Sequence, residues 1–106
     1  MTKDEQEAVV WFRRAAYQGL ADAQFILGLM YYQGEGVAKD EQEAVVWIRR
    51  AADQGLADAQ FILGLMHLKG KGVAQDPKQA AAWLRRAASD VERIPFRAVS
   101  YGDRGG

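Results

Sequence analysis

Residues 39–73 read KDEQEAVVWIRRAADQGLADAQFILGLMHLKGKGV, and residues 3–37 read KDEQEAVVWFRRAAYQGLADAQFILGLMYYQGEGV. The two copies are offset by 36 residues and differ at six of their 35 positions, and a third, partial copy, DPKQAAAWLRRAAS, occupies residues 76–89. A fixed period of this size is typical of stacked-repeat proteins, in which each repeat packs on its neighbours. We therefore predict one array of about two and a half repeats over residues 1–89.

The first part of each repeat predicts an amphipathic helix. Asp40 followed by Glu43 resembles a capping box, and Asp4 with Glu7 is the equivalent start in the first copy. Gly55 is expected to end the helix in a left-handed conformation. Between these ends, apolar residues recur at spacings of three and four, as one face of a helix requires. These residues are Ala44, Trp47, Ile48, Ala51 and Ala52.

The second part of each repeat predicts a helix that is apolar on nearly all sides. Gln24 is the only polar side chain between Ala23 and Met30, and a helix of this kind is buried by more than one neighbour. Gly28 and Gly64 lie in the middle of these helices, where glycine favours the close approach of a second helix. The result is an all-α solenoid of antiparallel helix pairs with short connections. Its five helices are expected at about 4–18, 22–33, 40–54, 58–69 and 76–89.

Composition argues against several classes of function. The 14 Lys and Arg residues balance the 14 Asp and Glu residues, so we expect no nucleic acid and no membrane as partners. Cysteine is absent, which excludes disulfides and thiolate metal sites. No apolar run is long enough to span a bilayer, and residues 1–12 do not resemble a signal peptide. The sequence as written predicts a cytoplasmic protein, or a periplasmic or secreted one if an upstream signal segment is missing.

No set of side chains resembles a catalytic or metal centre. His67 is the only histidine, and we expect it at the surface or in a groove, because Lys69 and Lys71 nearby would repel a bound cation. Ser89 and Ser100 have no neighbouring base motif. Acidic residues concentrate in the first turns of helices, where capping and the helix dipole account for them. We predict no catalytic residue, no metal, no cofactor and no enzymatic activity.

Two columns of side chains repeat on the first helix of each repeat. The tryptophans lie on its buried stripe, which favours core packing over a cofactor-binding or base-stacking role. The paired arginines align on its outer face, where nucleic acid could in principle bind, but interleaved acidic residues favour a solvated face with salt bridges. The columns consist of Trp11, Trp47 and Trp83, and of Arg13–Arg14, Arg49–Arg50 and Arg85–Arg86.

Each repeat carries a dense set of co-spaced residues. In the first complete unit these are Ala21, Ala23, Leu27, Gly28, Tyr31, Gly34, Gly36, Val37, Asp40, Ala44, Trp47, Ala51, Ala52 and Gly55. In the next unit they are Ala57, Ala59, Leu63, Gly64, Gly70, Gly72, Val73, Asp76, Ala80, Trp83, Ala87 and Ala88. With these residues the array resembles the SLR (Sel-one-like repeat) family, a relative of the tetratricopeptide repeats. The chain departs from the family's pattern at His67, where tyrosine is usual, in the missing helix before Asp4, and in the missing glycine after Ala88.

The resemblance implies a right-handed superhelix in which the helices at 22–33 and 58–69 line a concave inner wall. It also implies an adaptor that holds peptides or proteins, with no shared catalytic residues. The apolar side chains of these two helices exceed what packing on one neighbour requires, so the remainder are expected to line a groove for an extended peptide or an amphipathic helix. The candidate partner-binding residues are Phe25, Leu29, Tyr32, Phe61, Leu65 and Leu68.

Differences between the two full copies concentrate at the end of the second helix and in the loop that follows. Residues 31–33 read YYQ, whereas residues 67–69 read HLK. In an array whose other positions are fixed, such positions are where binding specificity can reside. Drift at tolerant positions explains them equally well.

The predicted function is a non-enzymatic protein-interaction or adaptor module, and the alternative is a self-assembling structural unit, dimeric or stacked. The ends of the array are expected to be uncovered, at Trp11 and Phe12 on one side and at Trp83 and Leu84 on the other, which favours a homodimer. Residues 90–106 leave the repeat pattern, and their Ile-Pro-Phe segment either caps the last repeat or belongs to a disordered tail.

Overall fold

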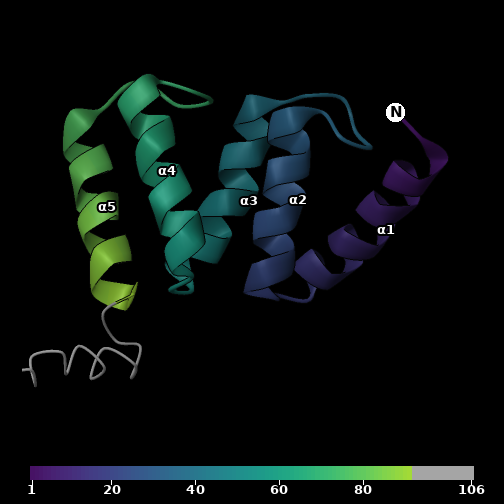
Figure 1. Ribbon diagram of the computed structural model, residues 1–106, viewed down its shortest axis with the longest axis horizontal. Helices are drawn as coiled ribbons and strands as arrows, with labels where there is room; N and C mark the ends of the chain where they lie inside the picture. The colour runs from purple at the N-terminus through teal and green to yellow at the C-terminus, as the bar shows by residue number, and fades with distance from the viewer. Residues whose placement is uncertain (92–106) are drawn as a thin grey trace, which may run out of the picture.

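The computed structural model describes residues 1–91 as five α-helices, with no strand in that part of the chain (Figure 1). Each helix packs on the next one in sequence, and Figure 1 shows the row running from α1 at one end to α5 at the other. Residues 92–106, which include the expected capping segment, lie outside the described residues. None of the described helices is long and apolar enough to cross a membrane. The helices are α1 (Lys3–Tyr17), α2 (Ala21–Gln33), α3 (Glu41–Asp53), α4 (Ala57–Lys69) and α5 (Pro77–Val91).

Only one of the two hydrogen bonds of the predicted capping box forms at the start of α3. Asp40 Oδ1 accepts a hydrogen bond from the backbone N–H of Glu43 at 3.0 Å. The backbone N–H of Asp40 donates to the carbonyl of Tyr31 at 2.8 Å. Because α2 supplies this acceptor, the N–H has no need of the Glu43 carboxylate. The cap therefore also ties each helix pair together, and Asp76 bonds to the carbonyl of His67 in the same way.

The predicted start of α1 at Asp4 is wrong. Thr2 caps the helix: its Oγ1 accepts from the N–H of Glu5 at 3.0 Å, and its own N–H donates to Glu5 Oε1 at 3.1 Å. At this cap the N–H of the capping residue donates to a carboxylate, whereas at Asp40 it donates to the carbonyl of Tyr31. At the other end of the array, α5 continues to Val91, two residues past the predicted end at Ser89.

The core consists of two clusters, each built across a boundary between repeats. Trp47 of α3 is 2% exposed and packs with buried residues of α1 and α2, and Trp83 of α5 is 7% exposed and packs with those of α3 and α4. Each tryptophan thus fills a site made by the preceding helix pair. Trp11 has no preceding pair in this chain and is 65% exposed. The uncovered end predicted at Trp11 is present, whereas the ring of Trp83 is not uncovered, because α3 and α4 bury it.

The mid-helix glycines mark close helix contacts, as predicted. A Cβ atom at Gly28 would lie 3.1 Å from the carbonyl oxygen of Ala44 on α3, and one at Gly64 would lie 3.2 Å from that of Ala80 on α5. Any larger side chain would push the paired helices apart. The repeat of the same contact fixes the same geometry in both helix pairs.

The buried Gln24 and the exposed Gln54 add a polar link between successive repeats. Gln24 Nε2 donates to the carbonyl of Ala16 at 3.1 Å, and its Oε1 accepts from Gln54 Nε2 at 2.9 Å. The same Gln54 nitrogen lies 2.8 Å from the carbonyl oxygen of Gly19. Gln54 therefore connects the end of α3 to the turn between α1 and α2. These bonds satisfy polar groups that the stacking of the repeats removes from water.

Candidate functional site

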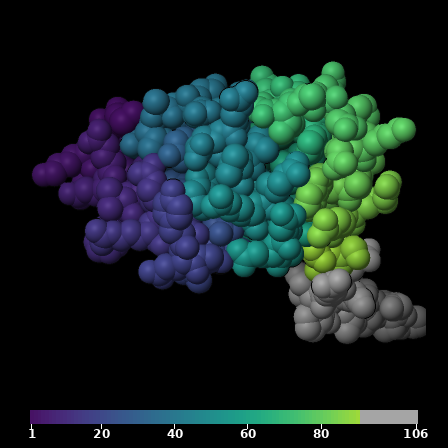
Figure 2. Space-filling model, turned by 180° about the vertical axis from the view of Figure 1, so that it is seen from behind, coloured from purple at the N-terminus to yellow at the C-terminus, as the bar shows by residue number. Residues whose placement is uncertain are grey.

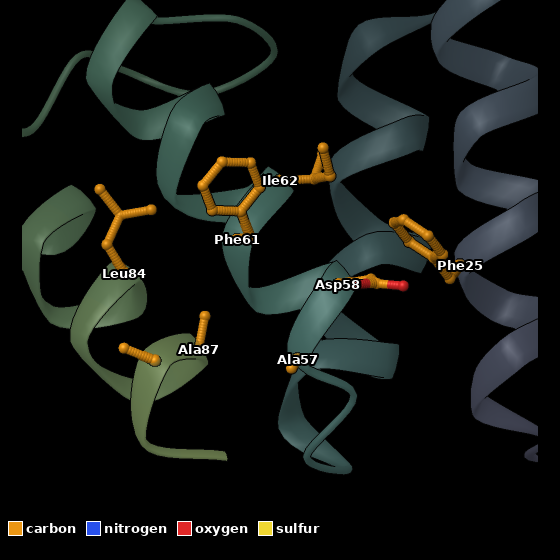
Figure 3. A pocket seen from close by; sticks show the side chains of 8 residues that line it. Phe25, Ala57, Asp58, Phe61, Ile62, Leu84 and Ala87 are labelled. Carbon is orange, nitrogen blue, oxygen red and sulfur yellow. The ribbon is translucent and has the colours of Figure 1, made fainter. Parts of the chain in front are cut away.

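A largely apolar hollow lies over α4, between α2 and α5 (Figure 3). Its volume is about 750 Å³. Figure 3 shows Phe61 of α4 facing Leu84 and Ala87 of α5, with Phe25 of α2 on the other side. Asp58 is the one charged residue in its lining. The lining consists of Phe25, Ala57, Asp58, Phe61, Ile62, Leu84, Ala87 and Ala88.

A second, smaller hollow of about 220 Å³ lies between α2 and α4, towards their C-terminal ends. Ile62 lines both hollows, and we call the two together the apolar groove. The second hollow has mostly apolar lining residues, and its two basic ones, Lys69 and Lys71, are exposed and form what we call its basic rim. Its lining consists of Leu29, Tyr32, Gln33, Ile62, Leu65, Met66, Lys69 and Lys71.

Five of the six candidate binding residues line the apolar groove. Phe25 and Phe61 lie in the larger hollow, and the smaller one takes Leu29, Tyr32 and Leu65. Leu68 lines neither hollow, although its side chain is 43% exposed. The role of these residues in binding a partner stays a prediction.

The sequence did not indicate that Ile62, Leu84 and Ala87 belong to the apolar groove. We expected Leu84 at an uncovered end of the array, and the sequence assigned no position to Ile62. Because α4 is apolar nearly all round, its hydrophobic pattern does not distinguish one face from another. The packing of α5 on α4 brings Leu84 and Ala87 beside Phe61.

The position of His67 corrects the expectation of a surface or groove histidine. Its ring is 6% exposed, and its Nε2 lies 3.3 Å from Nη2 of Arg49. A guanidinium group can only donate, so Nε2 accepts, while the buried Nδ1 has no partner among the described residues. In the first repeat, Tyr31 accepts from Arg13 Nη2 at 2.6 Å. Position 67 therefore belongs to the scaffold between α3 and α4.

The arginine column packs on the tryptophan column. The guanidinium carbons of Arg14, Arg50 and Arg86 lie 5.0, 4.6 and 4.5 Å from the ring centroids of Trp11, Trp47 and Trp83. This is the geometry of a cation–π contact. These three arginines are exposed, as a solvated outer face requires, and each also lies over a tryptophan ring.

Residues 1–91 contain no group of three or more His, Asp or Glu side chains placed to hold a metal ion. The linings of the apolar groove contain no Ser, Thr or His, and Tyr32 is the only hydroxyl-bearing residue in them. The apolar groove is therefore an apolar surface with Asp58 at one end and Lys69 and Lys71 at the other.

Comparison with known proteins agrees with the repeat pattern and the fold. The model of the Sel1 repeat family matches residues 1–20, 21–56 and 57–90. The structure is similar to that of c5321, a protective antigen of uropathogenic Escherichia coli with an SLR fold, at 42% identity and a TM-score of 0.78 over 79% of this chain. A Sel1 repeat protein from Oxalobacter formigenes is 40% identical, with a TM-score of 0.80 over 81% of this chain.

Helicobacter pylori cysteine-rich protein B is 27% identical, with a TM-score of 0.78 over 85% of this chain. The chain spans only 18%, 25% and 66% of the lengths of these three proteins, in the order given. Among curated proteins, no sequence matches this chain significantly. The helical solenoid predicted from the repeats is confirmed by the five helices and by these neighbours.

Proposed function

Because the chain belongs to the Sel1 repeat family, whose members generally bind other proteins, we propose that it is a non-enzymatic interaction module that holds a peptide segment of its partner in the apolar groove. The resemblance to an adaptor supports this proposal at the level of the family. The assignment of binding to the apolar groove rests on the residues of this chain alone.

The exposure of Phe61 is the observation that carries the proposal. Its side chain is 49% exposed and borders a hollow of about 750 Å³. Its counterpart in the first repeat, Phe25, is half-buried and packs against the cluster of α3 and α4. A large aromatic side chain left open beside an apolar hollow is typical of surfaces that bind peptides. The groove accepts apolar side chains from an extended strand or from one face of a helix.

We expect Phe61→Ser and Tyr32→Ala to weaken peptide binding by tenfold or more each, as for central residues of an interface (about 1.4 kcal/mol per factor of ten). The probe is a phage-displayed random peptide library, selected on the immobilised parent chain. The best peptide is then labelled with fluorescein, and its affinity is measured by fluorescence anisotropy.

Val46→Ser is the matched control, because Val46 is 43% exposed on α3 and lines neither hollow. It should leave the affinity unchanged. If Val46→Ser weakens binding as much as Phe61→Ser, or if the groove variants bind as the parent does, the peptide does not occupy the apolar groove. Circular dichroism checks that each variant keeps its helices.

The end of the array formed by α1 favours self-association as a second candidate function. Trp11, Tyr17 and Leu20 are 65%, 70% and 55% exposed, and Figure 2 shows α1 at the extremity of the molecule. Trp11 and Leu20 line a hollow of about 460 Å³. We expect a dimer at micromolar concentration in sedimentation experiments, and Trp11→Ser should shift it to monomer. A parent chain that sediments as a monomer excludes this candidate.

A further inference from the structure

We propose that the apolar groove selects peptides that carry an acidic side chain beside an apolar anchor, and that Lys69 and Lys71 make this selection. The inference rests on the proposed function, since it names the chemistry of the partner that the groove would hold. It concerns the smaller hollow, whose lining combines apolar residues with Lys69 and Lys71.

The two lysines stand beside apolar side chains. Lys69 is the last residue of α4, and Lys71 follows between two glycines of positive φ. Both line the hollow together with Tyr32 and Leu65. An apolar side chain of a peptide seated between α2 and α4 would place the neighbouring residues of the peptide within reach of these ammonium groups.

The charge at this rim is a property of the second repeat alone. The equivalent positions in the first repeat are Gln33 and Glu35, with a combined charge of −1, whereas Lys69 and Lys71 carry +2. The dipole of α4 favours a cation at its last residue, which accounts for Lys69 but not for Lys71 in the loop. Because the charges of the whole chain balance, the positive charge at this rim is local.

Neither lysine forms an ion pair with another residue of the described range 1–91. In the described part of the chain no carboxylate oxygen lies within the 4.0 Å of an ion pair from either ammonium group. The arginines behave differently: Arg50 covers Trp47, and Arg49 bonds to His67. The two lysines are therefore the cations of the groove that remain available to a partner's carboxylates.

The opposite end of the groove is acidic, which gives a bound peptide a direction. Asp58 lies in the first turn of α4 and Lys69 at its end. Eleven residues separate them in the sequence, which corresponds to about 17 Å along the helix axis at 1.5 Å per residue. An extended segment of about five residues covers this distance. A peptide with its acidic residue at the Lys69 end satisfies both the charge and the apolar lining.

The test uses the full chain and the same displayed peptide library. Lys69→Gln with Lys71→Glu installs the residues of the first repeat, so the fold already accommodates them at equivalent positions. Lys39→Gln with Lys78→Glu makes the same change of charge at exposed lysines that do not line the groove. We expect peptides selected on the parent to be enriched in Asp or Glu next to Leu, Phe or Tyr.

In fluorescence anisotropy, the Lys69/Lys71 variant should bind the selected peptide about tenfold more weakly, and the Lys39/Lys78 variant should match the parent within about twofold. Raising NaCl from about 50 to about 500 mM should weaken the parent's binding and leave that of the Lys69/Lys71 variant nearly unchanged, because added salt screens these exposed charges.

Peptides that bind without acidic enrichment and ignore the lysine changes, yet are lost with Phe61→Ser, would overturn this inference and leave the proposed function intact. An equal loss in both lysine variants would also overturn it, because it would indicate a non-specific effect of charge. Selection of no peptide by the parent would overturn both proposals.

Discussion

Trp47→Ala should lower the free energy of unfolding by about 3–5 kcal/mol, the range for truncating a large aromatic side chain in a core. Trp47 is 2% exposed, stands edge-on to the ring of Tyr17 with centroids 5.2 Å apart, and lies under the guanidinium group of Arg50. The substitution removes all of these contacts and leaves a cavity between the first two repeats.

Trp11→Ala is the matched control, because Trp11 occupies the same position in the first repeat but is 65% exposed. We expect a loss of less than about 1 kcal/mol for this change, as for most exposed positions. Urea unfolding followed by circular dichroism measures both variants without depending on tryptophan emission. Equal losses at the two positions would show that burial of the ring by the preceding repeat is not what stabilises the array.

Gly72→Ala should lower the free energy of unfolding by about 2–5 kcal/mol, which combines a left-handed backbone without glycine and an overpacked contact. Gly72 has φ +77°, and a Cβ atom there would overlap the carbonyl oxygen of Glu41. It would also lie 2.8 Å from Val45 Cγ2. The loop between α4 and α5 lies directly on α3 at this point, so it cannot yield without separating two repeats.

Gly55→Ala isolates the backbone part of this effect. Gly55 has φ +96°, but nothing lies within 4 Å of a Cβ atom built there, so we expect about 1–2 kcal/mol, the cost of the left-handed conformation alone. The same urea experiment measures both. A Gly72→Ala protein no less stable than the Gly55→Ala protein would contradict the close contact between loop and helix.

The sequence alone determined the helices and their turns, because these depend on residues close together in the chain. Asp40 caps α3 as predicted. After α3, Gly55 takes the left-handed conformation and the N–H of Leu56 bonds to the carbonyl of Ala51, as the glycine and the following leucine indicated. The close approach at Gly28 was also foreseeable, since mid-helix glycine has few other uses.

The candidate site was predicted in part for the same reason. Five residues that the apolar excess on α2 and α4 indicated line the groove, namely Phe25, Leu29, Tyr32, Phe61 and Leu65. Their role in binding stays a prediction. The wall contributed by α5 and the place of Leu68 outside both hollows depend on how the helices cross. A sequence pattern that is apolar on all sides holds no information about that angle.

Only the tertiary structure decided what each repeated residue does. Trp11 and Trp47 have the same local sequence on their N-terminal side, yet one is exposed and the other is buried. Gln54 bonds to Gln24 of the preceding repeat, and His67 is buried against Arg49. A local pattern specifies a helix or a turn, whereas burial and partners come from the neighbouring repeat, and at the ends of an array one of those neighbours is missing.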